Sequence, residues 1–171
     1  DRDGALVRSR QGHRASARID AVTVFEDREG TIWVGSISGL HRLRDPAISM
    51  ITTTHGLAGD NVYSILHDRR GDVWVGSWGQ GVTRLSGGRA RVYGIDEGLP
   101  AGEVTALFED AAGRIFVGTA AGLTLFNRDR LQRYEDPHGW LAGVVSSILE
   151  DHAGYWFGTG TGLVRQSGDR F

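Results

Sequence analysis

Trp78 and Gln80 are the residues of this chain whose types best suit the binding of a small polar ligand. An exposed indole can stack on a sugar ring, while a nearby amide exchanges hydrogen bonds with the hydroxyls of the sugar. Trp78 replaces Ile37, Ala120 and Gly160 in segments that otherwise repeat, so the fold does not require its size. The alternative is that Trp78 packs against a neighbouring part of the protein.

Three further residues, Trp140, Asn61 and Glu103, are candidates for the same site. Trp140 is a second aromatic candidate, but it aligns with Leu57 and Leu99, which predicts that it is buried. Asn61 and Glu103 occupy equivalent positions in the repeated segments, where a ring of polar groups can bind a polar ligand or a cation. The alternative is that such side chains hydrogen-bond the local backbone of a turn.

His55, Glu97 and His138 share a third equivalent position, immediately before the glycine of each linker. Two imidazoles and a carboxylate from neighbouring segments can approach a metal ion or bind a polar ligand. The competing interpretation is that all three are solvated residues of turns. No HExxH motif is present, and we predict neither a metal site nor a bound cofactor.

No set of residues has the spacing of a known catalytic motif. The chain has no cysteine, which excludes disulfides, cysteine-based zinc sites and a cysteine nucleophile. The segment 35–39 is not a nucleophile elbow, because its middle residue is Ile37. Segment 158–162 is rich in glycine and threonine, but it aligns with the same turn in every repeat and no helix follows it. We therefore predict no catalytic residue.

Charge and hydropathy exclude two classes of partner. The formal net charge is −2 and the pI is about 6.3, without the basic footprint of a nucleic-acid binder. No run of about 18 apolar residues is present, so we expect no insertion into a membrane by this segment.

The elements that must position these residues are four copies of one repeat. An Asp-x-x-Gly motif begins at Asp27, Asp68, Asp110 and Asp151, at intervals of 41, 42 and 41 residues. An aromatic residue, a small apolar run and a Gly-Ser or Gly-Thr pair follow each motif. The aspartate is expected to accept the backbone N–H two residues further on, and the glycine to supply the positive φ of a tight hairpin.

Each copy contains four short strand-like runs, which is the composition of a β-propeller blade. In the second copy the runs are residues 62–67, 72–77, 81–85 and 90–95. We therefore predict an all-β fold of four-stranded antiparallel sheets, with the whole chain 1–171 as one propeller region. The predicted blades are 20–54, 61–96, 103–136 and 144–171, preceded by an outer-strand segment at 1–19. Trp33, Trp74 and Trp156 are predicted to be core residues, and small residues are expected midway along the innermost strands (Thr23, Ser64, Ala106 and Ser147).

The repeat resembles the two-component regulator propeller repeat. The pattern I-x-x-D-x-x-G-x-I-W-V-G-[ST]-x-x-G-L extends here from Val24 to Leu40 and recurs in the other copies. Segment 56–61 is similar to the step that precedes the inner strand in that family. The resemblance implies a seven-bladed propeller in the extracytoplasmic sensor region of a bacterial histidine kinase or diguanylate cyclase. Many of the kinase members of that family sense oligosaccharides.

The function predicted from this resemblance is a ligand-sensing module, binding a carbohydrate or another small polar ligand in the periplasm or elsewhere outside the cytoplasm. One alternative is a propeller enzyme similar to streptogramin lyase. Another is a structural or protein-interaction propeller.

Four repeats are fewer than the family's ring requires, and three arrangements remain open. The chain can be part of a larger propeller, two chains can assemble into one ring, or the N-terminal segment can complete the fourth blade of a closed four-bladed ring. An incomplete ring exposes strand edges and an uncovered blade face, so we expect self-association.

Overall fold

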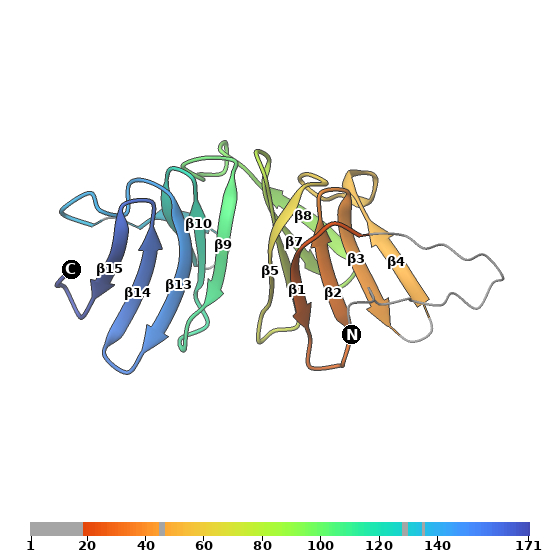
Figure 1. The fold of residues 1–171 in the computed structure, drawn as a ribbon, viewed down its shortest axis with the longest axis horizontal. Coiled ribbons are helices and arrows are strands. Elements are labelled where there is room, and N and C mark those ends of the chain that lie inside the picture. The colour runs from red at the N-terminus through yellow and green to blue at the C-terminus, as the bar shows by residue number, and fades with distance from the viewer. Residues whose placement is uncertain (1–18, 45–46, 128–129, 135) are drawn as a thin grey trace.

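A computed structural model describes residues 19–44, 47–127, 130–134 and 136–171, and these residues form an all-β fold (Figure 1). The first sheet contains β1 (Ala21–Glu26), β2 (Ile32–Ser36), β3 (Gly39–Arg44) and β4 (Ala47–Ile51). The second contains β5 (Val62–His67), β6 (Val73–Ser77), β7 (Gly81–Ser86) and β8 (Arg89–Tyr93). The third contains β9 (Val104–Glu109), β10 (Ile115–Thr119), β11 (Gly122–Asn127) and β12 (Arg130–Arg133). The fourth contains β13 (Val145–Asp151), β14 (Gly154–Thr159) and β15 (Gly162–Gln166).

All strands pair antiparallel in sequence order, as expected for propeller blades. The prediction of an all-β fold built from four sheets is confirmed. Within the described chain the fourth sheet has three strands, and an isolated bridge between Ser167 and Arg170 follows them. The predicted outer-strand segment 1–19 lies, apart from Ile19, outside the described residues. A single-turn 3-10 helix, η1 (Thr53–His55), lies in the linker between the first and second sheets.

The Asp-x-x-Gly hairpin is fastened by its aspartate. In the second sheet, Asp68 Oδ1 accepts the backbone N–H groups of Arg70 and Asp72, each at 2.9 Å. Its Oδ2 accepts the indole N–H of Trp74 at 2.8 Å, and Gly71 adopts φ 88°. The bond to the backbone two residues further on is confirmed here, and Asp27 and Asp151 make the same bond. The carboxylate therefore ties the turn to the largest core side chain of its own blade.

The third blade replaces the tryptophan with Phe116, which has no N–H to donate. Asp110 Oδ2 instead accepts Arg114 Nε at 2.6 Å and the hydroxyl of Tyr155, which comes from the next sheet, at 3.0 Å. A second guanidinium nitrogen of Arg114 donates to the Tyr155 hydroxyl at 2.6 Å. The lost indole bond is thus replaced by a network that also joins the third sheet to the fourth.

Close approach between successive sheets depends on a glycine in the second strand. Gly76 pairs with Ser64 on the inner strand, and a β-carbon at Gly76 would lie 2.6 Å from Cγ1 of Val104 in the next sheet. Gly35 has the same relation to Val62. The predicted small residues of the inner strands all pair with such a glycine. Glycine is required here because no side chain fits between two blades at this depth.

The hydrophobic core consists of one cluster between each pair of successive sheets. The cluster between the first two sheets contains Trp33, Leu40 and Leu57, and the next contains Trp74, Val82 and Leu99. The third cluster contains Phe116, Leu123, Leu141, Val145 and Phe157. The prediction that Trp33 and Trp74 are core residues is confirmed, since they are 7% and 1% exposed. Trp156 is only partly buried, because no further described sheet covers its side of the fourth sheet.

The four sheets form an open arc rather than a closed ring. Figure 1 shows the inner strands β13, β9, β5 and β1 in one row, with the fourth and first sheets extending away in opposite directions. Leu163 of the fourth sheet is 69% exposed, whereas its counterparts Leu40, Val82 and Leu123 are at most 1% exposed. The described sheets therefore leave the outward face of the fourth sheet uncovered. No helix among the described residues is long and apolar enough to cross a membrane.

Candidate ligand-binding site

Two solvent-exposed aromatic residues lie together in the second blade, one on its inner strand and one in the turn between its second and third strands. Trp78, in the turn between β6 and β7, is 46% exposed, and Tyr63 on β5 is 38% exposed. Their ring centroids are 4.9 Å apart, with an interplanar angle of 34°. The backbone N–H of Trp78 donates to the carbonyl of Asn61 at 2.9 Å, which fixes the turn against the start of β5. The pair presents a platform on which a flat apolar face can stack.

Sequence reasoning missed Tyr63, although a signal was present. Its counterparts in the other copies are Val22, Thr105 and Ser146, so the repeat does not require an aromatic residue there. The same argument that selected Trp78 therefore also applies to Tyr63.

Gln80, Asn61 and Glu103 gather near this platform. Gln80 is exposed, and its side-chain oxygen lies against Gly59, where a β-carbon would be 3.0 Å away. The backbone N–H of Gly81 donates to the carbonyl of Gly102 at 2.8 Å, which brings the residue before Glu103 against the turn. The turn that carries Trp78 therefore also contacts the linker before the third sheet.

The side chain of Asn61 does not make the local bond that the alternative interpretation required. Its Oδ1 is buried and has no hydrogen-bond partner among the described residues, while its backbone carbonyl holds Trp78. A buried carbonyl oxygen without a partner is costly, so a ligand donor that reached it would gain a bond at little expense.

Trp140 lies in a second exposed aromatic pair, in the linker before the fourth sheet. It is 47% exposed and stacks on His138, with ring centroids 4.3 Å apart and planes at 24°. The expectation that Trp140 is buried like Leu57 and Leu99 is wrong, because Leu141 occupies that position and is 2% exposed.

The carboxylate of Asp136 moves the buried position of this linker from residue 140 to residue 141. It does so by accepting the backbone N–H groups of His138, Trp140 and Leu141. The resulting turn directs Leu141 inward. Burial tends to raise the pKa of Asp136, but these backbone hydrogen bonds outweigh it and lower the pKa below its usual value.

His55 and Glu97 serve the linker turns. His55 Nδ1 accepts the backbone N–H of Thr52 at 3.2 Å, and Glu97 accepts that of Gly94 at 2.7 Å. The two side chains therefore make the same local bond in successive linkers. Within the described ranges, no three His, Cys, Asp or Glu side chains lie close enough to hold a metal ion, and His55, Glu97 and His138 are not brought together.

Comparison with known proteins agrees with the geometry of the blades. The sequence model of the two-component regulator propeller matches residues 56–79 and 98–121, which span the linker, the inner strand, the hairpin and the turn of the second and third blades. These two segments are repeats of that family. No curated protein sequence matches the chain.

Among solved structures, the extracellular domain of a hybrid two-component system of B. thetaiotaomicron is 26% identical, with a TM-score of 0.75. The match covers 85% of this chain and 21% of that one, so the chain spans about a fifth of that domain. An inactive virginiamycin B lyase of Staphylococcus aureus with quinupristin is 15% identical, with a TM-score of 0.72, over 92% of this chain and 55% of the lyase. PorZ of Porphyromonas gingivalis, a surface component of the type IX secretion system, is 16% identical, with a TM-score of 0.65, over 84% of this chain and 24% of PorZ. The last two share the fold alone.

Proposed function

Because the chain contains two-component regulator propeller repeats, we propose that it is part of the extracytoplasmic ligand-sensing region of a bacterial signal-transduction receptor. The similarity to the extracellular domain of a hybrid two-component system supports this assignment, including a location in the periplasm or elsewhere outside the cytoplasm. The module binds its ligand without transforming it. The likeness to a lyase, at 15% identity, concerns the fold alone.

The observation that supports carbohydrate as the ligand is the exposed pair Trp78 and Tyr63 beside the amide of Gln80 and the unpartnered Oδ1 of Asn61. Sugar rings have apolar faces that stack on aromatic rings and hydroxyls that pair with amides. Because the backbone of Gly81 and Gly102 joins this turn to the third sheet, occupancy biases the packing between two blades. That bias is the signal passed to the rest of the receptor.

Replacement of Trp78 by alanine is expected to weaken glycan binding at least tenfold, about 1.4 kcal/mol or more, as for a central aromatic contact. The measurement is isothermal titration of the purified chain with those members of an oligosaccharide panel that raise its Tm. Trp140→Ala is the matched control, because Trp140 is equally exposed but lies in another linker. Unchanged affinity in the Trp78 variant, with a loss in the Trp140 variant, would relocate the site. Absence of any glycan response in the unmodified chain would favour a scaffold.

We also propose that the two end faces of the arc bind each other in a second copy of the chain. Leu163 and Leu149 of the fourth sheet are 69% and 59% exposed, and Val24 of the first sheet is 63% exposed. The counterparts of Val24 are Ile65, Leu107 and Ile148, and each packs against an inter-sheet cluster. The uncovered faces of the first and fourth sheets therefore have the same kinds of residue that pack together at each of the three junctions between successive sheets.

Leu163→Arg is expected to abolish this association, because it places a charge in the centre of the repeated junction. Sedimentation velocity over a range of protein concentrations measures the change. Ile37→Arg is the control, since Ile37 is 59% exposed but lies in the turn between β2 and β3 rather than on a strand face. A monomeric unmodified chain, or a Leu163 variant that associates equally well, would contradict the proposal.

A further inference from the structure

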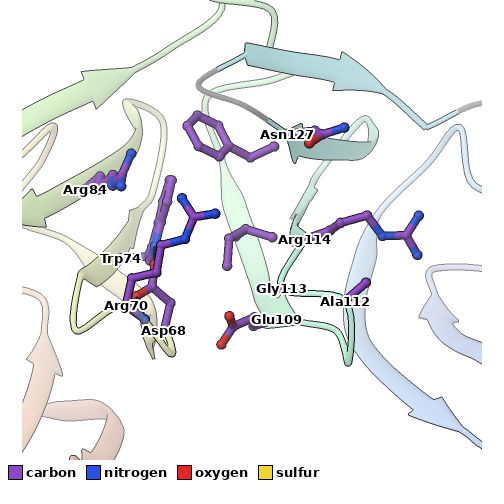
Figure 2. Close-up of a pocket in the computed structure, with 11 residues that line it drawn as sticks. Asp68, Arg70, Trp74, Arg84, Glu109, Ala112, Gly113, Arg114 and Asn127 are labelled. Atoms are coloured by element: carbon purple, nitrogen blue, oxygen red, sulfur yellow. Dashed lines mark hydrogen bonds between the residues drawn. The ribbon is translucent and has the colours of Figure 1, made fainter.

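A cavity of about 190 Å³ opens between the second and third sheets, at the hairpin end of the blades and away from Trp78 (Figure 2). The second sheet and its hairpin contribute Asp68, Arg70, Trp74 and Arg84. The third contributes mainly Glu109, Ile115, Phe126 and Asn127. The cavity is smaller than the sites of drug-sized ligands, about 300–1,000 Å³, which limits an occupant to one small molecule.

The next junction along the chain shows what fills this place. Tyr155 pairs with Glu150 in the fourth sheet just as Ile115 pairs with Glu109 in the third, so the two residues are equivalent. The Tyr155 hydroxyl donates to Asp110 and accepts from Arg114, which closes the junction between the third and fourth sheets. Ile115 has neither the length nor the hydroxyl, and the corresponding space remains open.

Among the described residues that line the cavity, Arg70 is the one arginine without an ion-pair partner. Arg84 is paired with Asp72, with Nη2 and Oδ2 2.6 Å apart, and Glu109 accepts the backbone N–H of Arg69 at 3.0 Å, with Arg69 Nε at 3.9 Å. The guanidinium of Arg70 makes no hydrogen bond or ion pair within the part of the chain that the structure describes. Figure 2 shows the Arg70 side chain extending alongside Trp74 into the space between the blades.

We propose that this cavity binds a small hydroxylated carboxylate. The Arg70 guanidinium presents a planar pair of donors that fits a carboxylate in two-point contact. A hydroxyl of the ligand takes the place that the Tyr155 hydroxyl occupies at the next junction, with the Asp68 carboxylate as its acceptor. Because the ligand contacts both blades, it bridges the second and third sheets reversibly, as Tyr155 permanently bridges the third and fourth. This site is separate from the Trp78 platform and does not depend on it.

The test is isothermal titration of the purified chain with glycerate and with glycerol, in which a hydroxymethyl group replaces the carboxylate. We expect glycerate to bind and glycerol to give no response at the same concentrations. Arg70→Gln is expected to weaken glycerate binding at least tenfold, and it leaves the fold intact because Arg70 is exposed. Ile115→Tyr is expected to abolish binding by filling the cavity as Tyr155 does, whereas Ile115→Val keeps the cavity open and retains binding.

Trp78→Ala is expected to leave glycerate affinity unchanged, which separates this site from the proposed glycan site. Equal responses to glycerate and glycerol, full affinity in Arg70→Gln, or full affinity in a folded Ile115→Tyr variant would each overturn the proposal. Absence of any response to glycerate in the unmodified chain would overturn it as well.

Discussion

Replacement of Trp74 by alanine is expected to lower the free energy of unfolding by about 3–5 kcal/mol, the range for a buried large aromatic side chain. Trp74 is 1% exposed and packs on Tyr93 and Phe126, with ring centroids at 6.1 and 4.7 Å. Its indole N–H is also bonded to Asp68, which is 3% exposed, so the substitution leaves a buried carboxylate oxygen without that donor. The loss therefore combines a cavity with an unsatisfied polar atom.

Urea denaturation followed by far-ultraviolet circular dichroism measures this effect, and Trp156→Ala provides the matched control. Trp156 has the same place in its blade and the same bond to an aspartate, at 2.7 Å, but it is only partly buried. We expect a clearly smaller loss for Trp156→Ala, because less apolar surface is removed from the interior. Equal losses at the two positions would mean that packing between the sheets does not dominate the contribution of these tryptophans.

Asp110→Asn is expected to cost about 3 kcal/mol, since it removes the charge from a fully buried carboxylate that binds Arg114 and Tyr155. The Arg114 side chain is 39% exposed and can still reach water, which keeps the loss below that of a wholly buried pair. Tyr155→Phe removes only the hydroxyl and is expected to cost about 1 kcal/mol. A loss for Asp110→Asn no larger than that for Tyr155→Phe would show that the charge contributes nothing.

The same network predicts how stability depends on pH. Burial tends to raise the pKa of Asp110, but hydrogen bonds from the backbone and side chain of Arg114 and from Tyr155 outweigh it, so the pKa is lowered in the folded protein. Its contribution to stability is therefore present above the unfolded-state pKa of about 3.9 and is lost as pH falls through the lower folded-state pKa. The difference in unfolding free energy between the unmodified chain and Asp110→Asn is expected to shrink below about pH 4. A difference that stays constant to pH 2 would contradict this.

At alkaline pH the relevant group is Tyr155. Burial, the hydrogen bond to Asp110 and the charge of Asp110 raise the pKa of Tyr155 to about 12. A raised folded-state pKa means that the stabilisation is present below the unfolded-state value of about 10 and is lost as pH rises towards 12. Tyr155→Phe lacks this titration, so its stability should fall less over that interval.

The architecture could be predicted from the sequence because every copy of the repeat has the same Asp-x-x-Gly turn between strand-like apolar runs. For the second blade, the predicted strand at 62–67 coincides with β5, and the other three differ from the observed strands by one or two residues at their ends. The bond from the aspartate to the tryptophan indole could not be predicted. It joins residues six positions apart across a hairpin, and the repeat pattern does not reveal a distance.

The site was predicted only where one copy departs from the others. That comparison selected Trp78 and could also have selected Tyr63. It failed at Trp140, because the Asp136 turn shifts the buried position by one residue, which the alignment of the repeats does not indicate. The cavity beside Ile115 could not be predicted from the sequence either, because its lining comes from two sheets and depends on which blade faces Arg70.

The three junctions between sheets use the same positions: a glycine opposite a small residue on one side, and a valine at the start of the next inner strand on the other. Any blade of this chain can therefore meet another through the same glycine–valine contact. A gene encoding such a protein can gain or lose one unit of about 41 residues and keep this glycine–valine contact at every junction, whereas the Asp110–Tyr155 bond belongs to one junction alone. Ring size can then change by duplication or deletion of whole units, while residues such as Trp78 and Arg70 vary within single copies.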